Sequence, residues 1–136
     1  MSAPAQVRAV SPFLLVRDVK RAAAYYNDVL GFTVRRFWGD PPMFAIADRD
    51  SVSVMLRQVQ PNETFQPNAA LEDCLDAYFS VRDADALYDE YKAKGADLVC
   101  APENQPYMMR EFQVRDPDGH VLIFAHDVSN QGAANG

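Results

Sequence analysis

The chain contains an internal repeat, which constrains its fold more than any other feature. The apolar segment 11–18 ends in Val-Arg-Asp, and segment 76–83 follows the same plan 65 residues later. Each of these aspartates, Asp18 and Asp83, precedes a helix-forming stretch that ends at Gly31 or Gly95. Aspartate is favoured at the N-cap of a helix, and glycine is favoured just past its C-terminus. The sequence therefore predicts two similar modules in tandem.

The strands that follow each helix also correspond. Segment 48–56 aligns with segment 116–124, because each places a short polar turn between two apolar runs, as in a hairpin. The strands before these turns are expected at 43–47 and 111–115, and the remaining strand of each module at 33–38 and 97–100. Each module then contains a strand, a helix and three strands. The predicted organisation is a first module at 8–58, a connector at 59–73, a second module at 74–127 and a disordered tail at 128–136.

Composition narrows the possible functions. The chain carries 13 Lys+Arg against 19 Asp+Glu, a formal charge of -6 that disfavours nucleic-acid binding, since phosphate contacts need clustered cations. No apolar run approaches the roughly 20 residues of a membrane span, and the N-terminus lacks the apolar core of a signal peptide. Two cysteines, Cys74 and Cys100, indicate reduced thiols in a cytoplasmic protein. Two histidines, His120 and His126, cannot form a three-histidine metal centre in one chain.

The repeat, the LLVRDVKRAAAYYNDVLGF opening and the REFQVRDPDGHVLIF closing together resemble the vicinal oxygen chelate superfamily. That superfamily includes glyoxalase I, extradiol dioxygenases, fosfomycin-resistance enzymes and metal-free bleomycin-resistance proteins. The resemblance covers about residues 8–127 and implies an α+β fold, in which the curved mixed sheets of two tandem βαβββ modules enclose a cleft. It also implies a homodimer in which faces from two chains complete two clefts. Because this fold hosts unrelated chemistries, function has to be argued from the site.

The superfamily's metal enzymes take ligands from four strand positions, two in each module. Counted from the capping aspartates and the DPDG turn, those positions hold Ser11, Met55, Asp76 and Ile123. A hydroxyl, a thioether, a carboxylate and an alkyl group do not form a good site for a divalent metal. His120 is interpreted as a solvated turn residue and His126 as a residue beyond the ligand position. We therefore expect no metal and no cofactor.

Strand alternation predicts which other side chains share the cleft face, because neighbouring residues point to opposite sides of a sheet. If Ser11 faces the cleft, Phe13 does so too. Phe44 aligns with Phe112 in the repeat, and both are expected in the core beneath the helices. The candidate ligand-binding residues are Ser11, Phe13, Trp38, Met55, Arg57, Asp76, Tyr78, Tyr107, Glu111, Gln113 and Ile123.

This expected cleft is apolar with few polar groups, which is typical of a small-molecule pocket. Two carboxylates, Asp76 and Glu111, favour a cationic or amine-bearing ligand; alternatively, Glu111 forms an ion pair with Arg57 or Arg115. The first hypothesis is a metal-free protein that sequesters a small organic or antibiotic-like compound. The second is an enzyme, a lyase, isomerase, epimerase or dioxygenase, with Asp76 or Glu111 as general base or with an atypical metal site. Both hypotheses use the same cleft, so the sequence leaves them open.

Overall fold

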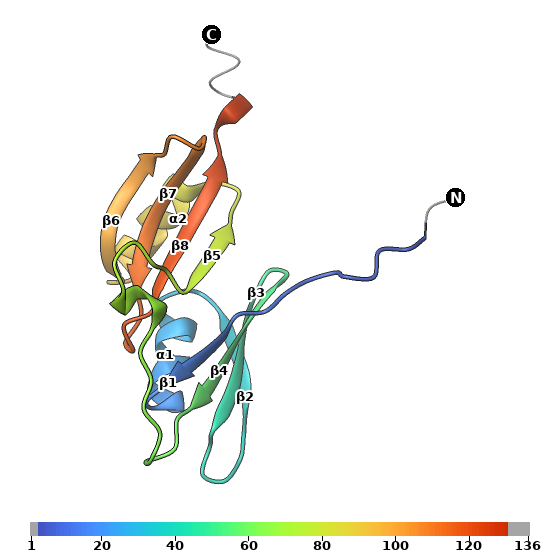
Figure 1. The fold of residues 1–136 in the computed structure, drawn as a ribbon, viewed down its shortest axis with the longest axis vertical. Coiled ribbons are helices and arrows are strands. Elements are labelled where there is room, and N and C mark those ends of the chain that lie inside the picture. The colour runs from blue at the N-terminus through green and yellow to red at the C-terminus, as the bar shows by residue number, and fades with distance from the viewer. Residues whose placement is uncertain (1–2, 131–136) are drawn as a thin grey trace.

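The computed structural model describes residues 3–130, which form two four-stranded sheets with one helix each (Figure 1). The first module comprises β1 (Phe13–Val16), α1 (Val19–Asp28), β2 (Thr33–Trp38), β3 (Phe44–Arg49) and β4 (Val52–Gln58). A short 3-10 helix at Asn68–Ala70 lies in the connector. The second module comprises β5 (Ala77–Ser80), α2 (Ala84–Ala93), β6 (Asp97–Asn104), β7 (Met109–Arg115) and β8 (Val121–Asp127). The strand orders β1-β4-β3-β2 and β5-β8-β7-β6 are equivalent, so the predicted α+β duplication is confirmed.

Both helices begin and end where the sequence signals predict. Asp18 has an extended backbone, and its carboxylate accepts hydrogen bonds from the Lys20 and Arg21 amides. Asp83 caps α2 in the same way. Gly31 and Gly95 adopt φ angles of +75° and +79°. This conformation is unfavourable for any residue that carries a Cβ atom. Local capping chemistry therefore sets the limits of both helices.

One apolar core lies on the helix side of both sheets and runs from one module into the other. Tyr26 and Tyr91 are fully buried in it, one from each helix. Phe32 of the first module packs edge-on against Phe79 of the second, with ring centroids 6.3 Å apart. The shared core holds the two modules together by removing apolar surface from water.

We call the sheet face opposite the helices the inner face. The expectation for Phe44 is wrong, because its ring lies on the inner face of the first sheet, 5.9 Å from the ring of Phe13. Strand pairing gives the reason. Ile46 pairs with Met55, nine residues later, across the β3–β4 hairpin, whereas in the second module Gln113 pairs with Ile123, ten residues later. A shift of one residue moves every side chain of a strand to the other face.

Figure 1 shows the two sheets at opposite ends of the long axis, and they do not close around a common cleft within one chain. Residues 3–10 extend away from the body of the protein. Val128, at the start of the expected tail, is buried and donates its amide hydrogen bond to the Met108 carbonyl, whereas 131–136 lie outside the described residues. Among residues 3–130, no helix is long and apolar enough to cross a membrane.

Candidate functional site

The inner face of the first sheet carries an open group of aromatic side chains. Phe13 is 55% exposed, and its neighbour across the sheet is Met55. The Trp38 ring lies 5.5 Å from that of Phe44, and the Arg36 guanidinium sits 4.4 Å from the centroid of Trp38. This face therefore offers flat apolar surfaces on which a planar ligand can stack.

The inner face of the second sheet is different, because it surrounds a carboxylate. Glu111 is only 5% exposed, and one of its oxygens accepts a 2.9 Å hydrogen bond from the Tyr78 hydroxyl. The other oxygen accepts a 2.5 Å bond from the Tyr107 hydroxyl. Alongside lie three buried apolar side chains of β8, namely Val121, Ile123 and Ala125. The cluster places one negative charge in a largely apolar setting.

Both phenols are held as hydrogen-bond donors. Burial, together with the hydrogen bond to Glu111, raises the pKa of Tyr78 well above its ordinary value. The hydrogen bond to Glu111 also raises the pKa of Tyr107, to about 12. The alternative considered for Glu111, an ion pair with Arg57 or Arg115, is not formed, since Arg57 pairs with Glu63 at 3.0 Å and Arg115 with Asp97 at 3.6 Å. Glu111 thus has donors but no cationic partner in the described part of the chain.

Asp76 is not free to react, because backbone amides already use its carboxylate. It accepts hydrogen bonds from the amides of Asn68 at 2.7 Å, Ala69 at 3.3 Å and Val121 at 2.9 Å. Its side chain is 4% exposed. These bonds fasten the connector to the start of β8. In this arrangement Asp76 organises the chain rather than offering a general base.

His120 is buried, contrary to its interpretation as a solvated turn residue. It is 3% exposed, with Nε2 2.7 Å from the Leu15 carbonyl and Nδ1 3.2 Å from an Asp76 oxygen. The Phe65 ring stacks on it at a centroid distance of 5.9 Å. The ring therefore links β1 of the first module to the turn of the second. Phe65 of the connector covers His120, and the sequence of the turn gives no sign of this contact.

The four metal-ligand positions do not fit a metal. Ser11 and Met55 are half-buried, Ile123 is a buried alkyl side chain, and Asp76 is held by three amides. In residues 3–130 there is no group of three or more histidine, cysteine, aspartate or glutamate side chains able to hold a metal ion. The donor set thus disagrees with the metal chemistry of the related enzymes.

The structure brings the predicted site residues together within each sheet, not across the two sheets. Gln113 pairs with Ile123 in the second sheet, as Phe13 pairs with Met55 in the first. The hydroxyl bonds of Tyr78 and Tyr107 to one carboxylate were not foreseen. For Tyr107 the sequence signal was its four-residue spacing from Glu111 across a tight turn, in which Met108 takes a φ of +63°; for Tyr78, 33 residues from Glu111, there was no local signal.

Comparisons with known proteins identify close relatives of this architecture. The family model described as Glyoxalase/Bleomycin resistance protein/Dioxygenase superfamily matches residues 7–124. The uncharacterized protein YraH of Bacillus subtilis (strain 168) is 30% identical over 122 residues, which cover 81% of this chain and 90% of that protein.

Two solved structures show the same fold at lower identity. The bleomycin-binding protein from bleomycin-producing Streptomyces verticillus, complexed with copper(II)-bleomycin, is 23% identical with a TM-score of 0.67. The match covers 88% of this chain and 96% of that one. TioX from Micromonospora sp. ML1 is 24% identical with a TM-score of 0.69, and the match covers 89% and 99% of the two chains.

Proposed function

The chain belongs to the glyoxalase/bleomycin resistance protein/dioxygenase superfamily, and on that premise we propose that it sequesters a small aromatic cation without using a metal ion. The observation that carries the proposal is the contrast between two inner faces. One presents open aromatic rings, and the other presents the buried carboxylate of Glu111. A ligand that joins a planar ring to an amine satisfies both.

The aromatic face supports the ring of the ligand. Phe13 and Trp38 remain exposed on a face that the helices do not cover. Exposed aromatic side chains gain free energy when a ligand ring removes them from water, and stacked or edge-on rings add about 0.5–1.5 kcal/mol per pair. The inner face of the first sheet is therefore suited to an aromatic body.

The carboxylate supports the charge of the ligand. A buried ion is unfavourable unless it is paired and hydrogen-bonded. Tyr78 and Tyr107 supply hydrogen bonds to Glu111, but they do not supply a positive charge. An ammonium group on a ligand would complete the pair, and the tyrosine rings beside it favour a cation further.

The donor chemistry supports binding without a resident metal. The four strand positions of the metal enzymes hold groups that do not fit a divalent ion in this chain. The bleomycin-binding protein of similar fold was crystallised with copper(II)-bleomycin, in which the metal is part of the ligand. We extend from that protein only the idea of a small organic ligand.

We also propose that a second copy of the chain completes the site. The two halves of the repeat differ just before their first strands: Leu75 packs on the inner-face cluster of β8, whereas Val10, at the equivalent position, is 89% exposed. Val7 is 91% exposed on the same extended segment. An apolar segment whose counterpart is covered within the chain requires a cover from outside it. Sedimentation velocity should show a dimer that Val10→Asp weakens, while Ala5→Asp serves as the matched control.

The ligand proposal is tested by titration with proflavine, a planar aromatic cation, in the presence and absence of Zn²⁺. Glu111→Gln should lower the affinity at least tenfold, since it removes the buried charge and keeps the shape. Glu72→Gln, the same change at an exposed position of the connector, should leave the affinity unchanged. Equal binding by Glu111→Gln, or binding that depends on added metal, would refute the proposal.

Glu111 also gives the enzyme hypothesis its best candidate, because a carboxylate on an apolar face can abstract a proton. For that role, one Glu111 oxygen must give up its hydrogen bond from a tyrosine hydroxyl and approach the substrate proton instead. Once a ligand is identified, conversion of it by the native chain and not by Glu111→Gln would establish the enzyme. Unchanged ligand after prolonged incubation would leave sequestration as the function.

A further inference from the structure

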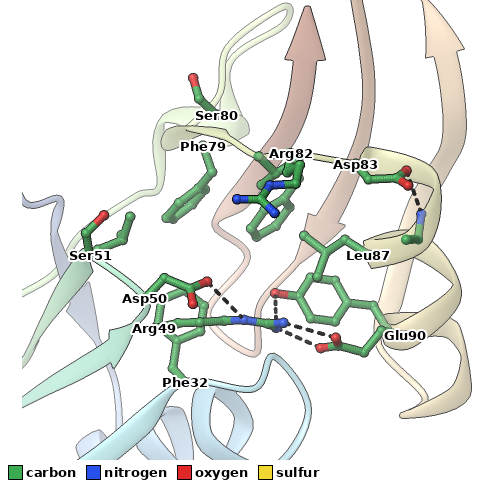
Figure 2. Close-up of a pocket in the computed structure, with 15 residues that line it drawn as sticks. Phe32, Arg49, Asp50, Ser51, Phe79, Ser80, Arg82, Asp83, Leu87 and Glu90 are labelled. Carbon is green, nitrogen blue, oxygen red and sulfur yellow. Dashed lines mark hydrogen bonds and ion pairs between the residues drawn. The ribbon is translucent and has the colours of Figure 1, made fainter.

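A groove of about 640 Å³ lies where the two modules meet, away from both inner faces (Figure 2). Its walls come from the β3–β4 turn in the first module and from the end of β5 and the first turns of α2 in the second. Small-molecule sites span roughly 300–1,000 Å³. The groove is therefore large enough for a compact ligand, and it touches both modules at once.

The floor of the groove is aromatic. Phe32 meets Phe79 edge-on at 6.3 Å, and Phe79 stacks on Phe124 at 4.7 Å with their planes 11° apart. Val52, Val81 and Leu87 extend this apolar lining. A ligand that enters the groove would therefore set an apolar group against these rings.

One wall is a fixed ion pair between the modules. The Arg49 guanidinium holds both Glu90 oxygens, at 2.7 and 3.0 Å, and also donates to the Leu30 carbonyl at 2.9 Å. The hydrogen bond to Glu90 raises the pKa of Arg49, so the pair stays charged. The Tyr91 hydroxyl donates to the same Leu30 carbonyl at 2.9 Å. These groups are satisfied by one another and hold the wall in place.

The rim keeps one cation and one anion with unused capacity. Within residues 3–130, the exposed Arg82 side chain forms no hydrogen bond or ion pair. The Asp50 side chain is 90% exposed, and its only ion pair within the described residues is a long 3.9 Å contact with Arg49, which Glu90 already holds. The remaining carboxylate of the lining, Asp83, caps α2 through the Ala86 amide. Figure 2 shows Asp50 and Arg82 entering the groove from different modules.

We propose that this groove binds a free α-amino acid with an apolar side chain. The carboxylate of the ligand pairs with Arg82, its ammonium group pairs with Asp50, and its side chain lies on the phenylalanine floor. A simple anion would meet Asp50 and Asp83 without compensation, and a simple cation would meet Arg82. A zwitterion satisfies both rim charges, and its apolar end matches the floor. Because it contacts both modules, it would also stabilise their junction.

Titration of the ¹⁵N-labelled full chain with L-phenylalanine tests the site by NMR. The amide signals of Ser51, Val81 and Leu87 should shift saturably. Phenylacetate, which lacks the ammonium group, and phenethylamine, which lacks the carboxylate, should each bind at least tenfold more weakly. Arg82→Gln and Asp50→Asn should each lower the affinity for L-phenylalanine about two- to fivefold, because both side chains are exposed. Asparagine tolerates the positive φ of residue 50, so the turn is kept. Arg21→Gln, which removes an exposed arginine from α1, is the matched control.

Several outcomes would overturn the proposal. One is the absence of saturable shifts up to about 50 mM L-phenylalanine. Another is equal binding of phenylacetate, which would exclude the role of Asp50. Equal loss in Arg21→Gln would show a general charge effect. Loss of phenylalanine binding in Glu111→Gln would assign the signals to the inner faces instead, whereas failure of proflavine binding alone would leave this groove unaffected.

Discussion

The DPDG turn depends on one buried hydroxyl of α1, and removing that hydroxyl should weaken the contact between the modules. The Tyr26 hydroxyl donates a 2.9 Å hydrogen bond to an Asp116 oxygen; Tyr26 is fully buried and Asp116 is 4% exposed. The other Asp116 oxygen accepts from the amides of Asp118 and His120. Tyr26→Phe leaves one carboxylate oxygen buried without a donor. Hydrogen bonds to charged groups contribute about 1.5–3 kcal/mol, so we expect a loss of about 2 kcal/mol.

Urea unfolding followed by circular dichroism measures this loss, and thermal unfolding should show a fall in Tm of roughly 6–10 °C. Tyr25→Phe is the comparison variant. The Tyr25 hydroxyl donates to the Arg115 carbonyl at 3.2 Å and accepts from the Asp97 amide at 3.1 Å, but both bonds lie near the surface, where water can replace them. Burial raises the pKa of Asp116, and the Tyr26 hydroxyl opposes the rise. The deficit of Tyr26→Phe should therefore be largest where Asp116 is ionised and should shrink as it protonates at low pH. Equal losses for the two tyrosines, or a deficit independent of pH, would refute the assignment.

Two further predictions concern the junction of the modules. Gly31→Ala should destabilise the protein by about 1 kcal/mol more than Gly95→Ala. Both glycines have a positive φ, so both substitutions strain the backbone. A Cβ at Gly31 would also lie 2.6 Å from an Arg49 nitrogen, whereas one at Gly95 meets nothing within 4 Å. Chemical unfolding of both variants checks the difference. The hydrogen bond from Arg49 lowers the pKa of Glu90 from its ordinary 4.5, so the pair's contribution is present above that pH and is lost as pH falls through the lower value. Because Glu90 is 40% exposed, this contribution is at most about 1 kcal/mol. Between pH 6 and 3, the free energy of unfolding of Glu90→Gln should therefore fall by up to about 1 kcal/mol less than that of the native chain. An unchanged acid dependence in Glu90→Gln would contradict it.

Helices and most strand faces were predictable from the sequence, because their signals are local. The capping aspartates and the positive-φ glycines lie within a few residues of the helix ends that they set. Alternation along β8 correctly placed Ile123 on the inner face. The hydrogen bond of the Tyr26 hydroxyl could not be predicted in this way, since its acceptor Asp116 is 90 residues away.

The fates of Asp76 and His120 could not be predicted, because both depend on how the connector folds back. Three amides reach the Asp76 carboxylate, and two of them belong to the connector. Phe65, also in the connector, covers His120. The connector belongs to neither repeated module, and it has no periodic pattern of apolar residues from which such contacts could be predicted. A carboxylate at a family ligand position therefore became a structural acceptor through contacts that no motif encodes.

The different chemistry of the two inner faces follows from a single residue in a turn. Counted between equivalent paired residues, the second hairpin contains one residue more than the first. Phe44 of β3, the partner of Arg57, is therefore the structural equivalent of Glu111 of β7, the partner of Ala125. The sequence alignment of the repeat instead pairs Phe44 with Phe112, which lies in the core. Since a one-residue shift exchanges the faces of a strand, the longer turn puts a carboxylate where the first module has an aromatic ring. The two halves of a duplicated fold can thus offer an aromatic surface and a charge to one ligand, provided that the two faces meet in the assembled protein.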